Sequence, residues 1–392
     1  MPPDPVAASA AGFDFHSLPE RRGSWSLKWD RFAGRDVIPM WVADMDFRAP
    51  PVVLEALRAR VDHGVFGYVE PGPELAETVA AAIGAAHGWH PHPDWFVWLP
   101  GLVSGLNLVA RAVGGPGDGV LTGTPVYPPF LSAPVNAGRT CQRVPLAQGA
   151  DGRWRYPDGA LDGSADGRSR LFLLCNPHNP VGRVFTRPEL ERLAEACLRR
   201  GLVMCADEIH CGLVLEPGLA HVPLASLDPE VAARSITLMA ASKTFNLPGL
   251  GTAFALVPDP GLRRALQAAM RGVVHRPMGI GLWATLAAYR DGEPWRRALV
   301  EVLRANRDTV ARRVGALPGF RVTPAEATYL AWIDARASGI ERPAEFFEAA
   351  GVGLYDGADF GAPGFLRLNF GCPPALLDRA LTRMERAVVA RG

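Results

Sequence analysis

Between residues 100 and 260, short apolar segments alternate with segments of helical character, and this alternation is the strongest constraint on the fold. The apolar segments are uniformly hydrophobic, and turn-forming residues bound each of them. Strands buried on both faces of a parallel sheet have this pattern. We expect such strands at GVLTGTP (119–125), LFLLCN (171–176), LVMCADE (202–208), SITLMAAS (235–242) and GTAFALV (251–257).

The segment TRPELERLAEACLRRG (186–201) indicates what connects these strands. Thr186 and Glu189 have the spacing of a capping box, and Gly201 is a typical helix stop. A strand, a helix and a second strand in succession make a crossover connection. The fold class predicted is therefore α/β, with a mostly parallel sheet flanked by helices.

After about residue 285 the pattern changes. A long helical stretch (294–317) precedes two strand-like segments, TYLAWID (328–334) and GFLRLNF (364–370), which indicate a smaller α+β domain. The Gly-, Ala- and Asp-rich stretch 149–169 is expected to be a surface loop. The predicted domains are a large one over 49–287 and a small one built from 1–48 and 288–392.

Composition narrows the classes of function. The chain has 41 Lys and Arg against 40 Asp and Glu, so no basic excess favours nucleic acid or an anionic membrane. No apolar run approaches the roughly 18 residues of a membrane span. The N-terminal MPPDPVAASAAG lacks signal-peptide features, and the six cysteines show no CxxC or framework spacing. We expect a soluble, globular, cytoplasmic protein.

Only two of the 41 basic residues are lysines, Lys28 and Lys243. Arginine keeps its proton under nearly all conditions, whereas a lysine amine can lose it and act as a base or a nucleophile. A retained lysine is therefore a weak indication of amine chemistry. For each lysine taken alone, retention by chance is the simpler explanation.

Three apolar segments end in polar residues: Asn176, Asp207 and Lys243. In open α/β sheets, ligands bind beyond the carboxyl ends of the strands. Taken singly, Asn176 fits a turn residue, and Asp207 fits a helix cap or the partner of an arginine. Together with a rare lysine, they favour a shared binding site.

Pyridoxal phosphate would account for all three residues. This cofactor needs a lysine for its covalent link, a carboxylate for its ring nitrogen and a donor for its phenolic oxygen. Its phosphate needs free backbone amides at a helix start, which the turn at Gly101 would provide. Tyr127 is placed to stack on the ring, although alone it would be a packing residue.

The motifs NPHNPVG (176–182), DEIH (207–210) and SKTFNLPGL (242–250) resemble fold-type I pyridoxal-phosphate enzymes of the aminotransferase class I/II superfamily. The resemblance extends from about residue 20 to the C-terminus and is most specific to the MalY/PatB group of cystathionine β-lyases. It is carried by MWVADMDF (40–47), HGVFGY (63–68), LPGLVSGLN (99–107), TPVYPPF (124–130), TYLAWID and GFLRLNFGCP (364–373).

This resemblance implies roles for the residues around the cofactor. Lys243 corresponds to the Schiff-base lysine and Asp207 to the partner of the ring nitrogen. Asn176 corresponds to the donor at the phenolic oxygen and lies near the substrate. His210 lies in the same region, and Tyr127 stacks on the ring.

It also implies roles at the phosphate and the substrate. Ser242 and the amides of Leu102 and Val103 are expected to hold the phosphate. Tyr68 resembles a tyrosine that reaches the phosphate of a neighbouring subunit, which implies a homodimer with shared active sites. Arg367 corresponds to the arginine that binds the α-carboxylate of an amino-acid substrate.

The chain departs from the family pattern at two places. Gly212 stands where an aspartate is expected, and Tyr355 and Asp356 stand where a Ser-Pro pair is usual. We expect both departures to reshape the substrate pocket. Lys28 also lies in a stretch that matches the family, so a structural role could explain its retention as well as a catalytic one.

Carbon–sulfur β-elimination is the leading predicted reaction. The alternatives are an aminotransferase, a specialised pyridoxal-phosphate enzyme of secondary metabolism and a regulator that works by binding another protein. No metal site is expected, because no cysteine or carboxylate completes a set with His87, His90 and His92.

Overall fold

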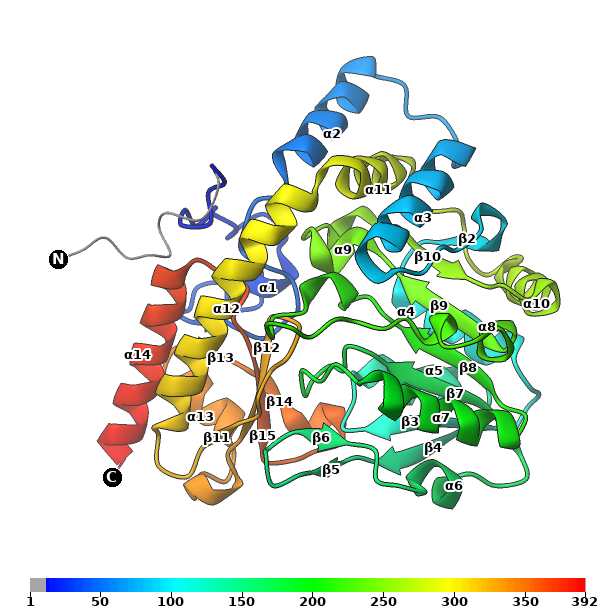
Figure 1. The fold of residues 1–392 in the computed structure, drawn as a ribbon. Coiled ribbons are helices and arrows are strands. Elements are labelled where there is room, and N and C mark those ends of the chain that lie inside the picture. Colours follow the sequence, from blue (N-terminus) through cyan, green and yellow to red (C-terminus); the bar gives the residue numbers. More distant parts are fainter. Residues whose placement is uncertain (1–11, 392) are drawn as a thin grey trace.

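A seven-stranded sheet forms the centre of the larger part of the molecule (Figure 1). The computed structural model describes residues 12–391, so the prediction made on the first eleven residues falls outside it. The strand order is β2-β10-β9-β8-β7-β3-β4, and β10 alone runs in the direction opposite to the other six strands. The strands are β2 (Phe96–Leu99), β3 (Gly119–Thr124), β4 (Thr140–Pro145), β7 (Ser169–Cys175), β8 (Val203–Asp207), β9 (Ser235–Met239) and β10 (Ala253–Leu256). The predicted, mostly parallel sheet is confirmed.

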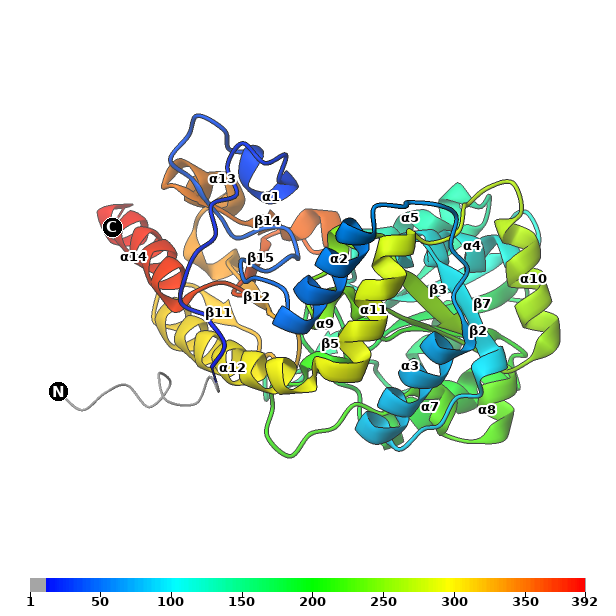
Figure 2. The same ribbon diagram turned by 90° about the horizontal axis from the view of Figure 1, so that it is seen from above.

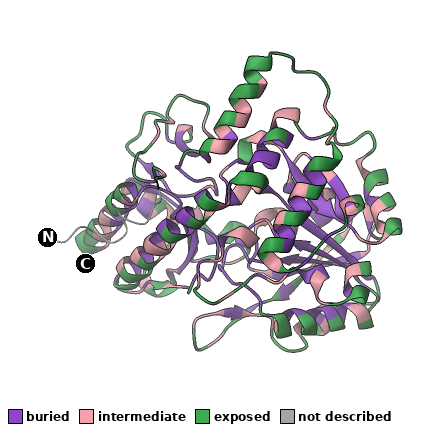
Figure 3. Ribbon diagram, turned by 45° about the horizontal axis from the view of Figure 1, so that its top comes forward, coloured by how far each residue is buried: buried purple, intermediate pink, exposed green. Residues whose placement is uncertain are grey.

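Both faces of this sheet are covered, which explains the uniformly apolar strands. Successive side chains of a strand point to opposite faces. In β7, Leu171 and Leu173 pack in one core with Leu106, whereas Phe172 and Leu174 belong to a second core on the opposite face. Figure 3 shows buried strands between helices whose outer faces are exposed.

Helices provide these two covers. α7 begins as predicted, because the backbone N–H and the hydroxyl of Thr186 both donate to the Glu189 carboxylate at 2.8 Å. Gly201 lies just after the end of α7 and has the left-handed backbone conformation, with φ 65°. The helices around the large sheet are α2 (Pro51–His63), α3 (Pro73–His87), α4 (Leu102–Ala112), α5 (Pro128–Asn136), α7 (Arg187–Arg199), α8 (Pro229–Ala233), α9 (Ala241–Thr244), α10 (Pro260–Met270) and α11 (Gly279–Asp291).

A smaller antiparallel sheet lies beside the large one (Figure 2). Its order is β11-β12-β15-β14, and the helices α12, α13 and α14 cover it. A short parallel pair, β1 and β13, joins the N-terminal segment to this part of the molecule. The elements are α1 (Leu27–Asp30), β1 (Ile38–Pro39), α12 (Glu293–Gly315), β11 (Arg321–Val322), β12 (Leu330–Asp334), α13 (Pro343–Ala349), β13 (Val352–Gly353), β14 (Tyr355–Asp356), β15 (Phe365–Asn369) and α14 (Pro374–Arg391).

The division into a large domain over 49–287 and a small domain from 1–48 and 288–392 stays a prediction. The separate seven- and four-stranded sheets and the pairing of β1 with β13 are compatible with it. Within the described residues, no helix combines the length and the apolarity that a membrane crossing requires.

The stretch 149–169 is more ordered than expected. It contains β6 (Trp154–Arg155), which pairs with β5 (Ala147–Gln148), and the short helix α6 (Ala160–Ser164). Trp154 and Leu161 are buried in the core beneath α7. Two apolar anchors thus hold a segment whose Gly- and Asp-rich composition is typical of a loop.

Candidate active site

A cavity of about 420 Å³ opens at the carboxyl ends of β7, β8 and β9. The strand register brings these ends together, because Cys175 pairs with Asp207 and Asp207 pairs with Leu238. All the predicted site residues except Asn176 and Tyr68 line the cavity. Its lining includes Trp41, Val42, Ala43, Leu102, Val103, Tyr127, Asn179, Asp207, His210, Ser242, Lys243, Tyr355 and Arg367.

Asp207, the last residue of β8, is a buried carboxylate without a cationic partner among residues 12–391. It accepts a hydrogen bond from the backbone N–H of Ile209 at 3.1 Å, so neither the arginine pair nor a helix cap explains it. Burial raises its pKa to about 7, although Lys243 opposes the rise. A cationic ligand bound beside Asp207 would therefore stabilise its buried carboxylate.

Lys243 lies in α9, just beyond the end of β9. Its Nζ donates to the carbonyl of Ala43 at 2.6 Å. Burial lowers its pKa to about 8, and the charge of Asp44 partly opposes this. An amine with such a pKa is uncharged in a useful fraction of molecules near neutral pH, as a base or a nucleophile must be.

Arg367 enters the cavity from β15 of the small sheet and is buried. Its Nη1 donates to Asn179 Oδ1 at 3.0 Å and its Nη2 to the carbonyl of Trp41 at 2.9 Å. The guanidinium lies 4.9 Å from the ring centre of Tyr355 and 4.8 Å from that of Phe360. Two hydrogen bonds and two aromatic rings therefore fix the position of the guanidinium, and a fixed guanidinium is suited to bind a carboxylate.

Of the two asparagines in the loop after β7, Asn179 faces the cavity and the predicted donor Asn176 does not. Asn176 lies outside the lining, and its Oδ1 accepts from the backbone N–H of Phe185 at 3.1 Å. Asn179 faces the cavity and contacts Arg367. The motif NPHNPVG contains the pair Asn-Pro twice, and only the path of the loop decides which asparagine faces inward.

The start of α4 lies at the cavity. Gly101 precedes the helix, and the first amides of a helix have no partner within it. Leu102 and Val103 line the cavity here, together with Ser242 from α9. Amides and a hydroxyl in this arrangement are suited to hold a phosphate.

His210 and Tyr127 complete the polar lining. His210 is buried, its Nδ1 has no partner among the described residues, and burial lowers its pKa to about 3. Burial raises the pKa of Tyr127, whose backbone N–H donates to the carbonyl of Asn179 at 3.0 Å. Both rings are therefore uncharged at neutral pH.

Tyr68 lies outside the cavity, in the segment between α2 and α3. Its side chain is 96% exposed, and its ring stacks on His275 with 6.5 Å between the ring centres. Its role in a site shared between subunits therefore stays a prediction.

Of the two family departures, one reaches the cavity. Tyr355 lines it and packs against Trp41, with 5.8 Å between the ring centres. Gly212 does not line the cavity, contrary to expectation. It faces Thr244 instead, whose Oγ1 would lie 2.6 Å from an added Cβ.

Sequence reasoning assigned no role to Trp41, Val42 and Ala43. Their segment carried part of the family resemblance, but two of these residues act through backbone carbonyls. A carbonyl is common to all residues, so no side-chain pattern marks it.

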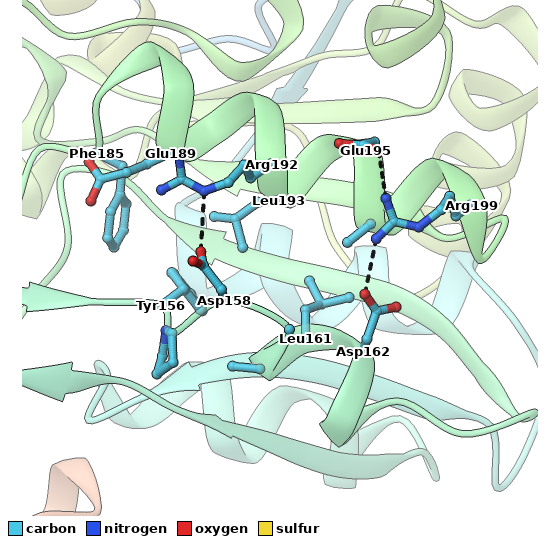
Figure 4. A pocket seen from close by; sticks show the side chains of 14 residues that line it. Tyr156, Asp158, Leu161, Asp162, Phe185, Glu189, Arg192, Leu193, Glu195 and Arg199 are labelled. Atoms are coloured by element: carbon cyan, nitrogen blue, oxygen red, sulfur yellow. Dashed lines mark hydrogen bonds and ion pairs between the residues drawn. The ribbon is translucent and has the colours of Figure 1, made fainter.

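A second hollow lies between α6 and α7 (Figure 4), and none of the predicted site residues lines it. Its arginines are already paired: Arg192 with Asp158 at 3.5 Å and Arg199 with Asp162 at 3.0 Å. In residues 12–391, no three His, Cys, Asp or Glu side chains gather as a metal site would require.

Comparisons of sequence and structure with known proteins identify the family of this chain. The family model "Aminotransferase class I and II" matches residues 35–384. The chain is 36% identical to "Cystathionine beta-lyase PatB" of Bacillus subtilis, over 96% of this chain and 100% of that protein. The solved structure of OvoB is 44% identical, with a TM-score of 0.94 over 96% of this chain and 100% of that one.

Cystalysin from Treponema denticola, whose crystal structure contains a pyridoxal 5'-phosphate cofactor, is 31% identical with a TM-score of 0.93. That match covers 97% of this chain and 100% of cystalysin. The chain therefore belongs to the aminotransferase class I and II family, within the group that includes PatB.

Proposed function

We propose that the protein is a pyridoxal-phosphate-dependent carbon–sulfur β-lyase, which cleaves an S-substituted L-cysteine to a thiol, pyruvate and ammonia. The observation that carries the proposal is the convergence of the Lys243 amine, the Asp207 carboxylate and the Arg367 guanidinium on one cavity. The similarity to PatB and to cofactor-containing cystalysin supports the choice of reaction and cofactor.

The polar groups of the cavity fit this cofactor. The buried Asp207 carboxylate would pair with a protonated ring nitrogen, and the amides of Leu102 and Val103 with the Ser242 hydroxyl would hold a phosphate. Asn179 would face the phenolic oxygen. When bound, pyridoxal phosphate supplies an aldehyde that condenses with amines and a ring that takes up the electron pair of a deprotonated carbon.

The residues of the chain would then act in a fixed order. Arg367 binds the α-carboxylate of the substrate and orients its Cα–H bond, as positioning groups do. Lys243, in its neutral form, takes the proton from Cα. As the Cα–Cβ double bond forms, the Cβ–S bond breaks, and the sulfur leaves with its electron pair and takes up a proton. Water converts the remaining enamine to pyruvate and ammonia.

A product assay tests the proposal. Purified holoenzyme should release equimolar thiol and pyruvate from cystathionine or another S-substituted cysteine with no 2-oxo acid present, and Lys243→Ala should release neither. An aminotransferase, which the family model keeps as the second candidate, would turn over only with a 2-oxo acid. A protein that only binds would give no product in either assay.

We further propose that the protein is a homodimer with shared active sites. The segment that carries Tyr68 exposes an apolar surface, since Val65 is 71% and Phe66 72% exposed. A second copy placed on this surface would cover it and bring Tyr68 to the neighbouring site. We also propose a cytoplasmic location. The six cysteines support it, because all of them are free thiols.

A further inference from the structure

The second of the two lysines, Lys28 in α1, is fully buried but does not line the cavity. Its Nζ donates to Asp46 Oδ2 at 2.7 Å and to the carbonyl of Asp44 at 3.1 Å. A buried charge is costly unless it is paired and hydrogen-bonded, so this lysine has a specific function in the structure.

The partner, Asp46, is also buried and is satisfied on both oxygens. Its Oδ1 accepts from Trp29 Nε1 at 2.8 Å and from Arg21 Nη1 at 2.6 Å, and its Oδ2 faces Lys28. A guanidinium at position 28 would bring five N–H groups to three nearby oxygens, namely Asp46 Oδ2, the Asp44 carbonyl and Asp44 Oδ1 at 3.9 Å, and would leave buried donors unpaired. This explains why the chain keeps a lysine here, although it uses arginine almost everywhere else.

The Lys28–Asp46 pair holds one end of the segment 41–46, and this segment contacts both key groups of the site. The carbonyl of Trp41 accepts from Arg367, and the carbonyl of Ala43 accepts from Lys243 at 2.6 Å. Two side chains that lie far apart in the sequence are therefore placed by carbonyls two residues apart.

Arg21 and Tyr329 also contact this segment. Arg21 Nη2 donates to Asp44 Oδ2 at 2.6 Å, and Tyr329 Oη donates to the carbonyl of Ala43 at 2.9 Å.

Two asparagines hold further backbone groups of the segment. Asn369 Nδ2 donates to the carbonyls of Val42 at 2.6 Å and Asp44 at 2.7 Å. Asn246, just after α9, pairs with both the N–H and the carbonyl of Met45 at 3.0 Å. The segment is thus tied to the small sheet and to the residues that follow α9, the helix that carries Lys243.

We propose that Lys28 is a positioning residue, which with Asp46 clamps the segment 41–46 and thereby places the Lys243 amine and the Arg367 guanidinium. The inference rests on the roles that the proposed function gives to those two groups. Loss of the clamp would let the carbonyls of Ala43 and Trp41 shift away from their donors.

The first measurement follows Lys243 in the full-length protein after removal of the cofactor. Labelling with limiting acetic anhydride between pH 6 and 10, read by mass spectrometry of the Lys243 peptide, should give a midpoint near pH 8. In Lys28→Met the midpoint should fall by about 0.5–1 pH unit, because the ammonium loses a carbonyl acceptor. The charges that face Lys243, namely Asp44, Arg367 and Asp207, are retained in this variant.

The second measurement is steady-state turnover of the holoenzyme. Lys28→Met should raise KM for the amino acid about tenfold, because Arg367 loses one of its two anchors. The matched control is Arg183→Met, which breaks other ion pairs, to Glu326 and to Glu189, both at 2.6 Å, that do not contact the segment 41–46. The control should lose stability but keep the wild-type KM and the wild-type labelling midpoint.

If Lys28→Met does not fold, Asp46→Asn replaces it, because the amide oxygen can still accept from Trp29, while the charge is lost and an NH2 group takes the place of the oxygen that accepts from Lys28. The proposal is overturned if the clamp variant melts at a lower temperature, as the control does, and keeps both the midpoint and KM. Labelling of the cofactor-free protein does not depend on the reaction, so failure of the proposed lyase activity would be seen separately, in the product assay alone.

Discussion

Asp207→Asn should make the cofactor-free protein more stable at pH 8 while removing most activity of the holoenzyme. The reason is the unpaired, buried carboxylate, whose pKa rises to about 7 from an ordinary 3.8. The unfolded chain loses this proton near pH 4 and the folded chain near pH 7. The folded state thus binds more protons between these values, and stability falls as pH rises through this window.

A shift of about 3 units corresponds to about 4 kcal/mol, which is the upper limit of the effect above pH 7. For a chain of this length that is up to about 5 °C in Tm. The amide cannot ionise, so the Tm advantage of Asp207→Asn over wild type should grow from pH 5 to pH 8. Exposed Asp359→Asn serves as the control and should leave the pH dependence of wild type unchanged.

Differential scanning calorimetry of the cofactor-free proteins at pH 5 and pH 8 measures this difference. In the holoenzyme, wild type should have the higher Tm of the two proteins, because the bound cofactor gains a charged partner only when residue 207 is an aspartate. Parallel pH dependence of wild type and Asp207→Asn would refute the reasoning, since it would mean that Asp207 carries no unusual cost in the folded chain. Near-normal turnover of the variant would remove Asp207 from the mechanism.

Other predictions concern the remaining site residues. Borohydride reduction of the holoenzyme should fix the cofactor to the peptide that contains Lys243, and finding it elsewhere by mass spectrometry would contradict the assignment. Arg367→Ala should raise KM about 100-fold for small and large thioethers alike, because all share the carboxylate; a loss restricted to large substrates would place Arg367 elsewhere. Tyr68→Phe should weaken cofactor binding about tenfold without unfolding, and a fully active monomer in sedimentation would exclude the shared site. Tyr355→Ser should change the relative KM values of S-substituted cysteines, whereas an unaltered ranking would show that its ring does not contact the S-substituent.

Much of the fold follows from local patterns. Five of the seven strands of the large sheet form where apolar runs predict them, and the helix that begins after Thr186 forms where a capping box predicts it, whereas β2 and β4 were not predicted. The stretch 149–169 departs from prediction because two side chains, Trp154 and Leu161, bury themselves beneath α7. Local composition does not report such long-range packing.

The candidate site divides in the same way. Lys243 and Asp207 could be chosen from the sequence, because the carboxyl ends of buried parallel strands are where ligands bind in open α/β sheets. The choice of Asn179 over Asn176 depends on the path of a loop, and the roles of Trp41 and Ala43 depend on carbonyls that every residue has.

The sequence by itself determined the α/β class, the strand ends that carry the functional groups and the family, because these depend on residue types and their order along the chain. Only the tertiary structure decided what surrounds those groups. The buried Lys28–Asp46 pair, the carbonyls that receive Lys243 and Arg367, and the lack of a direct ion pair to Asp207 in the described residues all arise from distant segments meeting. Solvation and hydrogen bonding depend on the whole surroundings of a group, and these surroundings exist only once the chain has folded.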